Sequence, residues 1–120
     1  MEITLMDEDK EIQEAVDIAR EVVPPSIAQN LFGLRVEYMP DAMLDDGDIL
    51  VITRQNTAKD GDTVAVFIKG VETTLVRKYF TRADKLIFLQ PPNPTYKGAD
   101  WEPEDFQILG RVVMVIRKLS

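Results

Sequence analysis

Residues 34–52, LRVEYMPDAMLDDGDILVI, decide the fold because they hold two apolar segments separated by a polar turn. The turn is centred on Asp46-Gly47-Asp48. An Asp-Gly pair between apolar segments is a strong turn signal, since Gly tolerates positive φ and Asp can hydrogen-bond to its own backbone. The same signal returns as Asp60-Gly61-Asp62, directly before the segment TVAVFI at residues 63–68. Two such turns, each followed by a β-branched segment, predict a small and strongly β domain.

Other apolar segments predict the remaining strands. They are expected at residues 31–36, 49–54, 72–80, 85–89 and 106–117, in addition to residues 63–68. Lys69-Gly70 is expected to form a hairpin turn. The proline-rich stretch Pro91–Pro103 contains Tyr96 and Trp101 and is expected to be an irregular excursion. We expect Trp101 to pack over the core, and an exposed recognition surface is the alternative.

Residues 1–23 predict a short apolar start followed by an amphipathic helix. Its apolar face would consist of residues at helical spacing, namely Ile12, Ala15, Val16, Ala19 and Val22 or Val23. The acidic residues 7–9 are expected at its N-terminus, where the helix dipole favours negative charge. Pro24-Pro25 is expected to end the helix. We expect the helix to pack on the domain, and a partner-binding helix is the alternative.

Composition narrows the possible functions. The 120 residues, 45% of them hydrophobic, fit one domain with a real core. No segment has the length or apolarity of a membrane span or a signal peptide, and a cytoplasmic location is expected. The absence of cysteine and histidine excludes disulfides, thiolate chemistry, histidine triads and the usual transition-metal sites, so no cofactor or metal is expected. A net charge of −7 argues against direct nucleic-acid binding.

Several separated motifs resemble the peptidase domain of the self-cleaving LexA-type repressors and their relative UmuD. In that family an apolar strand is followed by Gly-Asp-Ser-Met or Gly-Met-Ser-Met, then by a short loop, and then by Asp-Gly-Asp and a second strand. Met39 matches the methionine of this pattern, and Asp46-Gly47-Asp48 matches its Asp-Gly-Asp turn. The resemblance continues through the segments ETTLVR at 72–77, LQPPNP at 89–94 and ILGRVV at 108–113. It therefore covers roughly Ile27–Leu119.

The resemblance implies a mostly β fold, a bent antiparallel sheet of the LexA and signal-peptidase type with one short N-terminal helix. Residues 1–26 would be a helical segment packing on the domain, and residues 27–120 the peptidase-fold domain. Family members dimerise through the C-terminal strand. The implied dimer interface comprises Gly110, Val112, Val113, Met114, Val115, Ile116 and Arg117.

Both members of the family's Ser–Lys dyad are replaced in this sequence. Alignment on Asp46-Gly47-Asp48 puts Tyr38 at the position of the nucleophilic serine and Val76 at that of the lysine base. A Ser–Lys dyad needs a hydroxyl beside an amine whose pKa is lowered by burial. Valine has no proton acceptor, and a tyrosine phenol is neither placed nor activated like a serine hydroxyl. The sequence therefore indicates a pseudo-protease.

The family's cleavage segment is also expected to be absent. It would lie near the N-terminus around an Ala-Gly or Cys-Gly bond, whereas the first glycine here is Gly33. Active relatives bind that segment as an extended strand, so the degenerate cleft would be blocked or reused for binding an extended segment. We expect Met39, Met43 and Arg77 to line it, with the two methionines as apolar fillers rather than ligands.

Other candidate chemistry is weak. The sequence has two serines. Ser26 follows two prolines and Ser120 is the last residue, and neither is expected to be a nucleophile. A relocated Tyr38–Lys78 dyad is disfavoured because Lys78 would sit about 6.5 Å along the strand from Val76. The acidic cluster Asp41, Asp45, Asp46 and Asp48 lacks the EF-hand spacing, and turn formation explains it.

The predicted function is a non-catalytic, LexA-like regulatory and dimerisation protein of the DNA-damage (SOS) response. The expected partner is a second copy or a LexA-type repressor, and a recombinase filament or a translesion polymerase is also considered. Two alternatives stay open: a divergent autocleaving serine peptidase, and a C-terminal fragment of a LexA-type transcriptional repressor. LexA-type repressors place a helix-turn-helix domain first, and none is expected in front of Ile27.

Overall fold

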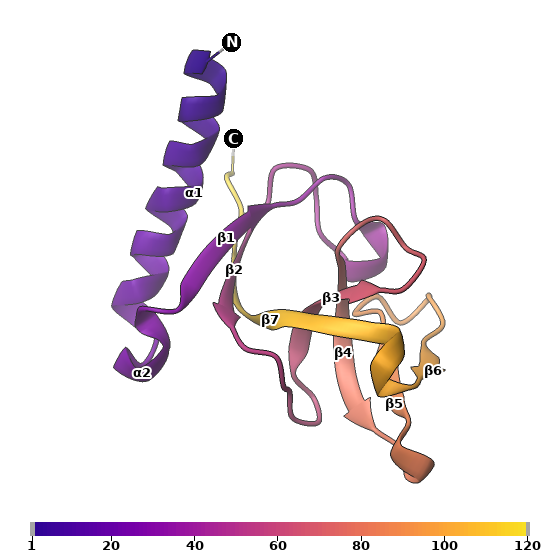
Figure 1. The fold of residues 1–120 in the computed structure, drawn as a ribbon. Coiled ribbons are helices and arrows are strands. Elements are labelled where there is room, and N and C mark those ends of the chain that lie inside the picture. Colours follow the sequence, from indigo (N-terminus) through magenta and orange to yellow (C-terminus); the bar gives the residue numbers. More distant parts are fainter. Residues whose placement is uncertain (1, 120) are drawn as a thin grey trace.

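The computed structural model describes residues 2–119, with side chains from residue 10 onward, and has a mostly β fold (Figure 1). Seven strands form one antiparallel sheet in the order β1-β2-β7-β3-β4-β5-β6. The elements are α1 (Glu2–Val22), α2 (Pro25–Ala28), β1 (Leu31–Arg35), η1 (Pro40–Ala42), β2 (Ile49–Arg54), β3 (Thr63–Ile68), β4 (Leu75–Thr81), η2 (Ala83–Lys85), β5 (Ile87–Gln90), β6 (Ala99–Trp101), η3 (Pro103–Asp105) and β7 (Phe106–Ile116). The prediction of a mostly β, antiparallel domain is confirmed.

The two Asp-Gly-Asp turns have the same geometry. In each, the backbone N–H of the last aspartate donates to the carbonyl three residues earlier, Asp48 to Asp45 at 3.1 Å and Asp62 to Lys59 at 3.0 Å. Gly47 and Gly61 both have φ of +89°, which only glycine adopts without strain. These turns lead directly into β2 and β3, as the sequence predicted.

Strand β7 lies inside the sheet, where it joins the β1–β2 pair to strands β3–β6. It pairs with β2 along Gly110–Ile116 and with β3 along Phe106–Arg111. Register shifts occur in both pairings, between Val51 and Ile52 and between Ala65 and Val66. Bulges of this kind bend a strand and increase its twist, so they account for the change of direction between the two halves.

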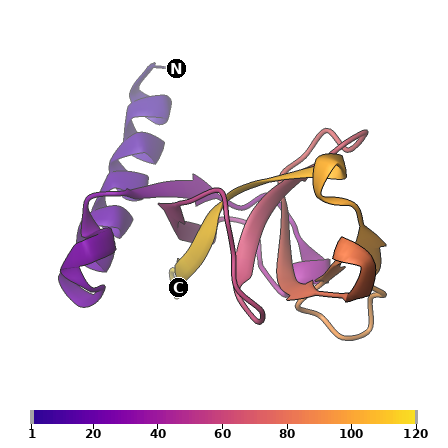
Figure 2. The same ribbon diagram turned by 60° about the horizontal axis from the view of Figure 1, so that its bottom comes forward.

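Helix α1 is longer than predicted, spanning 21 residues from Glu2. No glycine or proline interrupts the chain before Pro24, so the apolar start continues the helix and residues 7–9 lie in its second turn rather than at its N-terminus. Its buried residues are Ala15, Val16 and Ala19, which pack on β1 and β2. Figure 2 shows α1 at the β1–β2 end of the sheet, away from β4–β6. Neither α1 nor another helix within residues 2–119 could cross a membrane.

The region between β5 and β7 is more regular than predicted. Within Pro91–Pro103, residues Ala99–Trp101 form β6, which pairs with β5. Trp101 packs against the apolar cluster under β3, β5 and β7, as expected for a residue that covers the core. The sequence signal for β6 was hidden because the strand is three residues long and two of those residues are exposed.

Candidate functional site

A hollow of about 520 Å³ opens between the end of β1, the η1 turn and the start of β4. We call it the β1–β4 hollow. It is lined by residues 34–41, Leu50 and residues 73–76. The lining comes from β1, β2 and β4. In the pairing order β1 and β4 are separated by β2, β7 and β3, and the curvature of the sheet brings them together.

The floor of the hollow is apolar. Val76 is only 2% exposed and belongs to a buried cluster with Val36, Leu50 and Ile52. Met39 packs against the same cluster, and Tyr38 lies at the rim with its side chain 70% exposed. The structure thus brings Tyr38 and Val76, the two positions aligned with the family's dyad, to one hollow. A valine side chain there can contact an aliphatic group but cannot accept a proton.

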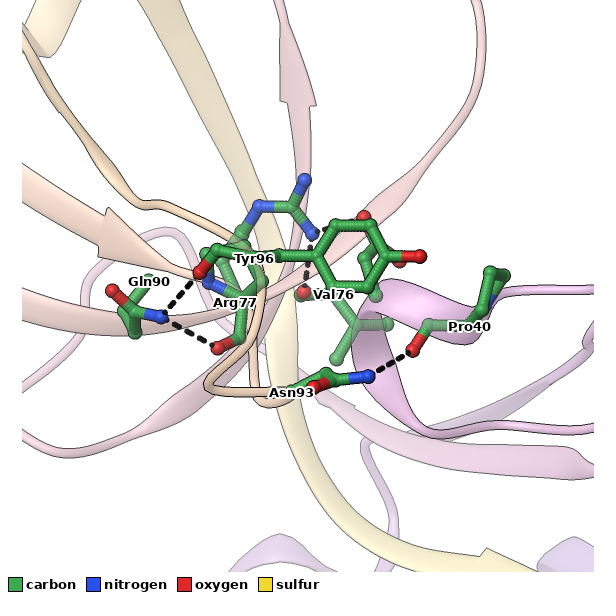
Figure 3. Close-up of polar contacts among 8 residues, drawn as sticks. Pro40, Val76, Arg77, Gln90, Asn93 and Tyr96 are labelled. Carbon is green, nitrogen blue, oxygen red and sulfur yellow. Dashed lines mark hydrogen bonds and ion pairs between the residues drawn. The ribbon is translucent and has the colours of Figure 1, made fainter.

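Four residues hold the η1 wall of the hollow against β4. We call Pro40, Asp41, Arg77 and Asn93 the η1 brace. Arg77 Nη1 lies 2.9 Å from Asp41 Oδ2. Asn93 donates its backbone N–H to the Asp41 carbonyl at 2.9 Å and its Nδ2 to the Pro40 carbonyl at 3.1 Å (Figure 3).

The loop that carries Asn93 is itself held in place. Gln90 Nε2 donates to the carbonyls of Pro91 at 3.1 Å and Tyr96 at 3.0 Å, and closes the loop from inside (Figure 3). A Cβ on Gly98 would lie 2.5 Å from Phe88 Cζ and 2.8 Å from the Leu89 carbonyl oxygen, so only glycine fits where the loop returns to β5. Nothing in the sequence marked Asn93 as a contact of the η1 turn, because 53 residues separate it from Pro40.

The other predicted cleft and dyad residues lie around the hollow rather than in it. Met43 has a left-handed φ of 57° and a 57% exposed side chain, and it is not among the lining residues. Arg77 does not line the hollow itself, but it forms an ion pair with Asp41, which does. Lys78 is exposed and Ser26 lies in α2, and neither lines the hollow. Ser120 lies outside the described residues.

The acidic residues of the first turn are engaged in ion pairs and turn contacts. Asp48 is 1% exposed and accepts two hydrogen bonds from Arg117, Nε to Oδ1 at 2.9 Å and Nη2 to Oδ2 at 2.8 Å. These hydrogen bonds lower the pKa of Asp48 and raise that of Arg117. Asp46 accepts the backbone N–H of Tyr38. Within the described part of the chain, no group of three or more acidic residues is arranged to hold a metal ion.

The residues of the predicted dimer interface have different surroundings along β7. Gly110 is buried inside the sheet, where a Cβ would lie 2.3 Å from the Thr53 carbonyl oxygen. Val115 is 43% exposed, and Val112, Val113, Met114 and Ile116 are half-buried. The Arg117 side chain is engaged with Asp48. From Val112 onward, no described strand pairs with the edge of β7 opposite β2.

Comparisons with known proteins agree with the resemblance. The family described as Peptidase S24-like matches residues 4–113. The chain is 34% identical over 108 residues to the LexA repressor of Roseiflexus sp. (strain RS-1), covering 88% of this chain and 49% of that protein. It is 39% identical over 110 residues to LexA repressor 2 of Nocardia farcinica (strain IFM 10152), covering 90% and 42%. It thus spans about half the length of the curated relatives it matches.

Proposed function

Because the chain belongs to the Peptidase S24-like family, we propose that it is a non-catalytic, LexA-like regulatory and dimerisation protein of the DNA-damage (SOS) response. The observation that carries this proposal is Val76 at the floor of the β1–β4 hollow, 2% exposed among apolar residues. A buried lysine at that position could serve as a base, and a valine cannot. The hollow would then bind a segment of a partner without cleaving it.

The edge of β1 supports binding of an extended segment. The Val36 N–H donates to the Asp48 carbonyl at 2.7 Å and the Val36 carbonyl accepts from Gly47 at 3.0 Å, so the backbone of Val36 faces β2. Successive residues of an antiparallel strand turn their hydrogen-bonding groups to opposite sides. The backbone groups of Arg35 and Glu37, which line the hollow, therefore face away from β2.

The start of β4 offers a second edge. Tyr79 donates to the Asp62 carbonyl at 2.9 Å and accepts from Gly61 at 2.7 Å, so its backbone faces β3. By the same alternation, the backbone groups of Val76 and Thr74 face away from β3. Strand β5 pairs with β4 only from Lys78 onward. Outward-facing backbone groups of β1 and β4 therefore flank the hollow, as recognition of an extended peptide by β-augmentation requires.

The open edge of β7 supports the proposed dimer. Residues Val112–Ile116 have β2 on one side and no described strand on the other. An unpaired edge that carries exposed Val115 is a template for pairing with another chain. We assign this edge to a homodimer, or to a heterodimer with a LexA-type repressor.

The chain would have two parts and would act on proteins. Residues 1–26 would be an accessory helical segment and residues 27–120 the peptidase-fold domain. With a net charge of −7, the chain would act through protein partners in the cytoplasm rather than by gripping DNA directly. A recombinase filament and a translesion polymerase are the other partner classes to test.

Native mass spectrometry of the protein, alone and mixed with an intact LexA-type repressor from the same host, tests the proposal. Mixed dimers would identify a protein that titrates or reshapes the repressor. Homodimers that ignore the repressor would direct the search to the polymerase or the recombinase. A strict monomer would contradict the dimerisation role. Autolysis at alkaline pH would contradict the non-catalytic role and support a divergent peptidase instead.

A second candidate is the regulatory and dimerisation half of a LexA-type repressor. The observation that favours it is that the match covers only 42–51% of the length of the first three relatives. Fusing the DNA-binding portion of the Roseiflexus repressor to this chain tests that candidate. Operator binding restored by the fusion, and lost when the β7 edge is disrupted, would support it.

A further inference from the structure

We infer that Arg77 blocks strand addition at β4 and thereby restricts an incoming peptide to the β1 edge of the β1–β4 hollow. This inference rests on the proposed peptide-binding function, and it assigns to Arg77 the control of which edge of that site a peptide can use. The peptide we expect is an extended one that places an aliphatic side chain against the apolar floor formed by Val36, Leu50 and Val76.

The Arg77 guanidinium lies between the backbone of Val76 and the carboxylate of Asp41. Its Nη1 donates to the carbonyl of Val76 at 2.9 Å and lies 2.9 Å from Asp41 Oδ2. By the alternation along β4, the Val76 carbonyl points away from β3. It is the acceptor that a strand added to β4 would use, and the Arg77 guanidinium already donates to it and lies beside it.

Arg77 is held in this position by a mostly buried ion pair. The Arg77 and Asp41 side chains are only 13% and 20% exposed, so water competes weakly for their contact. Asn93 holds Asp41 and Pro40 from the other side through two further hydrogen bonds. A peptide N–H would have to compete with this held guanidinium for the Val76 carbonyl, and hydrogen bonds to charged groups are stronger than neutral ones.

The β1 edge of the hollow differs from the β4 edge. In the described structure, no side chain donates a hydrogen bond to the outward carbonyls of Arg35 and Glu37 as Arg77 does to the carbonyl of Val76. The Arg35 guanidinium instead donates to Glu11 at 3.2 Å and reaches towards the Gly47 carbonyl at 3.5 Å. The β1 edge is therefore available while the β4 edge is not, which makes Arg77 a positioning residue for the ligand.

A double variant, Arg77→Met with Asp41→Asn, removes the guanidinium without leaving an unpaired carboxylate. The matched control is Arg82→Met with Asp100→Asn, which removes an ion pair of 3.5 Å whose side chains are half exposed and which does not line the hollow. Fluorescent peptides tiled across the LexA repressor of Roseiflexus serve as probes, and anisotropy gives the dissociation constants. Circular dichroism checks that each variant is folded.

We expect the Arg77/Asp41 variant to bind the selected peptide about tenfold more tightly than the parent, because the second edge becomes available. The control variant should bind like the parent. Should the double variant not fold, Arg77→Lys replaces it, because a compact ammonium cannot reproduce the guanidinium's planar fork.

Equal or weaker binding by the Arg77 variants, with clear binding by the parent, would overturn this inference and leave the proposed function standing. Absence of peptide binding by the parent and by every variant would overturn the proposed peptide-binding function and the inference with it.

Discussion

At the scale of single residues, Asp48 and Asp62 show how one turn motif serves two purposes. Each is the last residue of an Asp-Gly-Asp turn, and its carboxylate accepts a hydrogen bond from the backbone N–H of the residue three positions earlier. The distance is 2.8 Å from Asp45 to Asp48 and 2.9 Å from Lys59 to Asp62. Only Asp48 also receives Arg117 from the end of β7. The first turn therefore ties the C-terminal end of the sheet to the β1–β2 connection, and the second turn does not.

Asp48→Asn should lower the free energy of unfolding by about 2 kcal/mol, because the charge-assisted hydrogen bonds between the buried Asp48 carboxylate and the partly exposed Arg117 are weakened. The matched control Asp62→Asn should cost about 1 kcal/mol, since it weakens one turn contact only. Urea unfolding of both variants checks this difference. Equal losses would mean that the Arg117 contact contributes nothing beyond the turn.

The stability of the same pair should depend on pH in a defined direction. The folded-state pKa of Asp48 is lower than its ordinary value of 3.8, chiefly because of the hydrogen bond from Arg117. A lowered pKa contributes stability that is complete above the unfolded-state value and is lost as the pH falls through the folded-state value. Urea midpoints of the parent should therefore fall more steeply below pH 4 than those of Asp48→Asn, and parallel curves would contradict this assignment.

Val76→Lys tests the apolar floor of the β1–β4 hollow. Because Val76 is 2% exposed, the new amine would be desolvated, and the variant should lose about 2–4 kcal/mol of unfolding free energy at neutral pH. Thr73→Lys, at an exposed position lining the same hollow, is the control and should be nearly neutral. A stable Val76→Lys protein would show that the floor still accommodates a lysine.

At the scale of elements, strand β7 depends on close approach to β2. A Cβ on Gly110 would lie 2.3 Å from the carbonyl oxygen of Thr53, whereas a Cβ on Gly33 would meet the side chain of Ile12 at 2.6 Å. Backbone in a sheet cannot move aside as a side chain can. Gly110, which the sequence placed in a dimer interface, thus has a role inside the monomer.

Gly110→Ala should therefore destabilise the protein by about 3 kcal/mol, and Gly33→Ala by about 1 kcal/mol. Thermal unfolding checks the order of the two variants. The Gly33→Ala loss should shrink when Ile12→Ala is added, since that substitution removes the clashing methyl group. A Gly110→Ala variant as stable as the parent would contradict the close approach of β7 to β2.

At the scale of the whole molecule, the proposed association depends on the edge of β7 that β3 leaves unpaired. Val115→Lys should abolish the dimer and leave the monomer folded, because the side chain is already 43% exposed. The control Val71→Lys replaces a valine of similar exposure, 40%, near the β3–β4 turn and should not affect assembly. Analytical ultracentrifugation separates the two outcomes, and a Val115→Lys dimer would contradict the proposed interface.

Features that depend on neighbours along the chain could be predicted from the amino-acid sequence. Both Asp-Gly-Asp turns, the bounds of β2 and β3 and the apolar face of α1 follow from local backbone preference and from periodicity. The family resemblance was readable for the same reason, because its motifs are short and contiguous. The length of α1 and the strand β6 were misjudged where a local signal was weak or absent.

Contacts between residues far apart in the chain became visible only in the folded molecule. Arg117 reaches Asp48 across 69 residues, and Asn93 reaches Pro40 across 53. Tyr38 and Val76 line one hollow because the sheet bends at the two register shifts of β7. Such contacts depend on strand order and register, which are set by the packing of the whole core rather than by any one segment. The physical reason is that local preferences act between chain neighbours, whereas long-range contacts form only when the complete sheet is assembled.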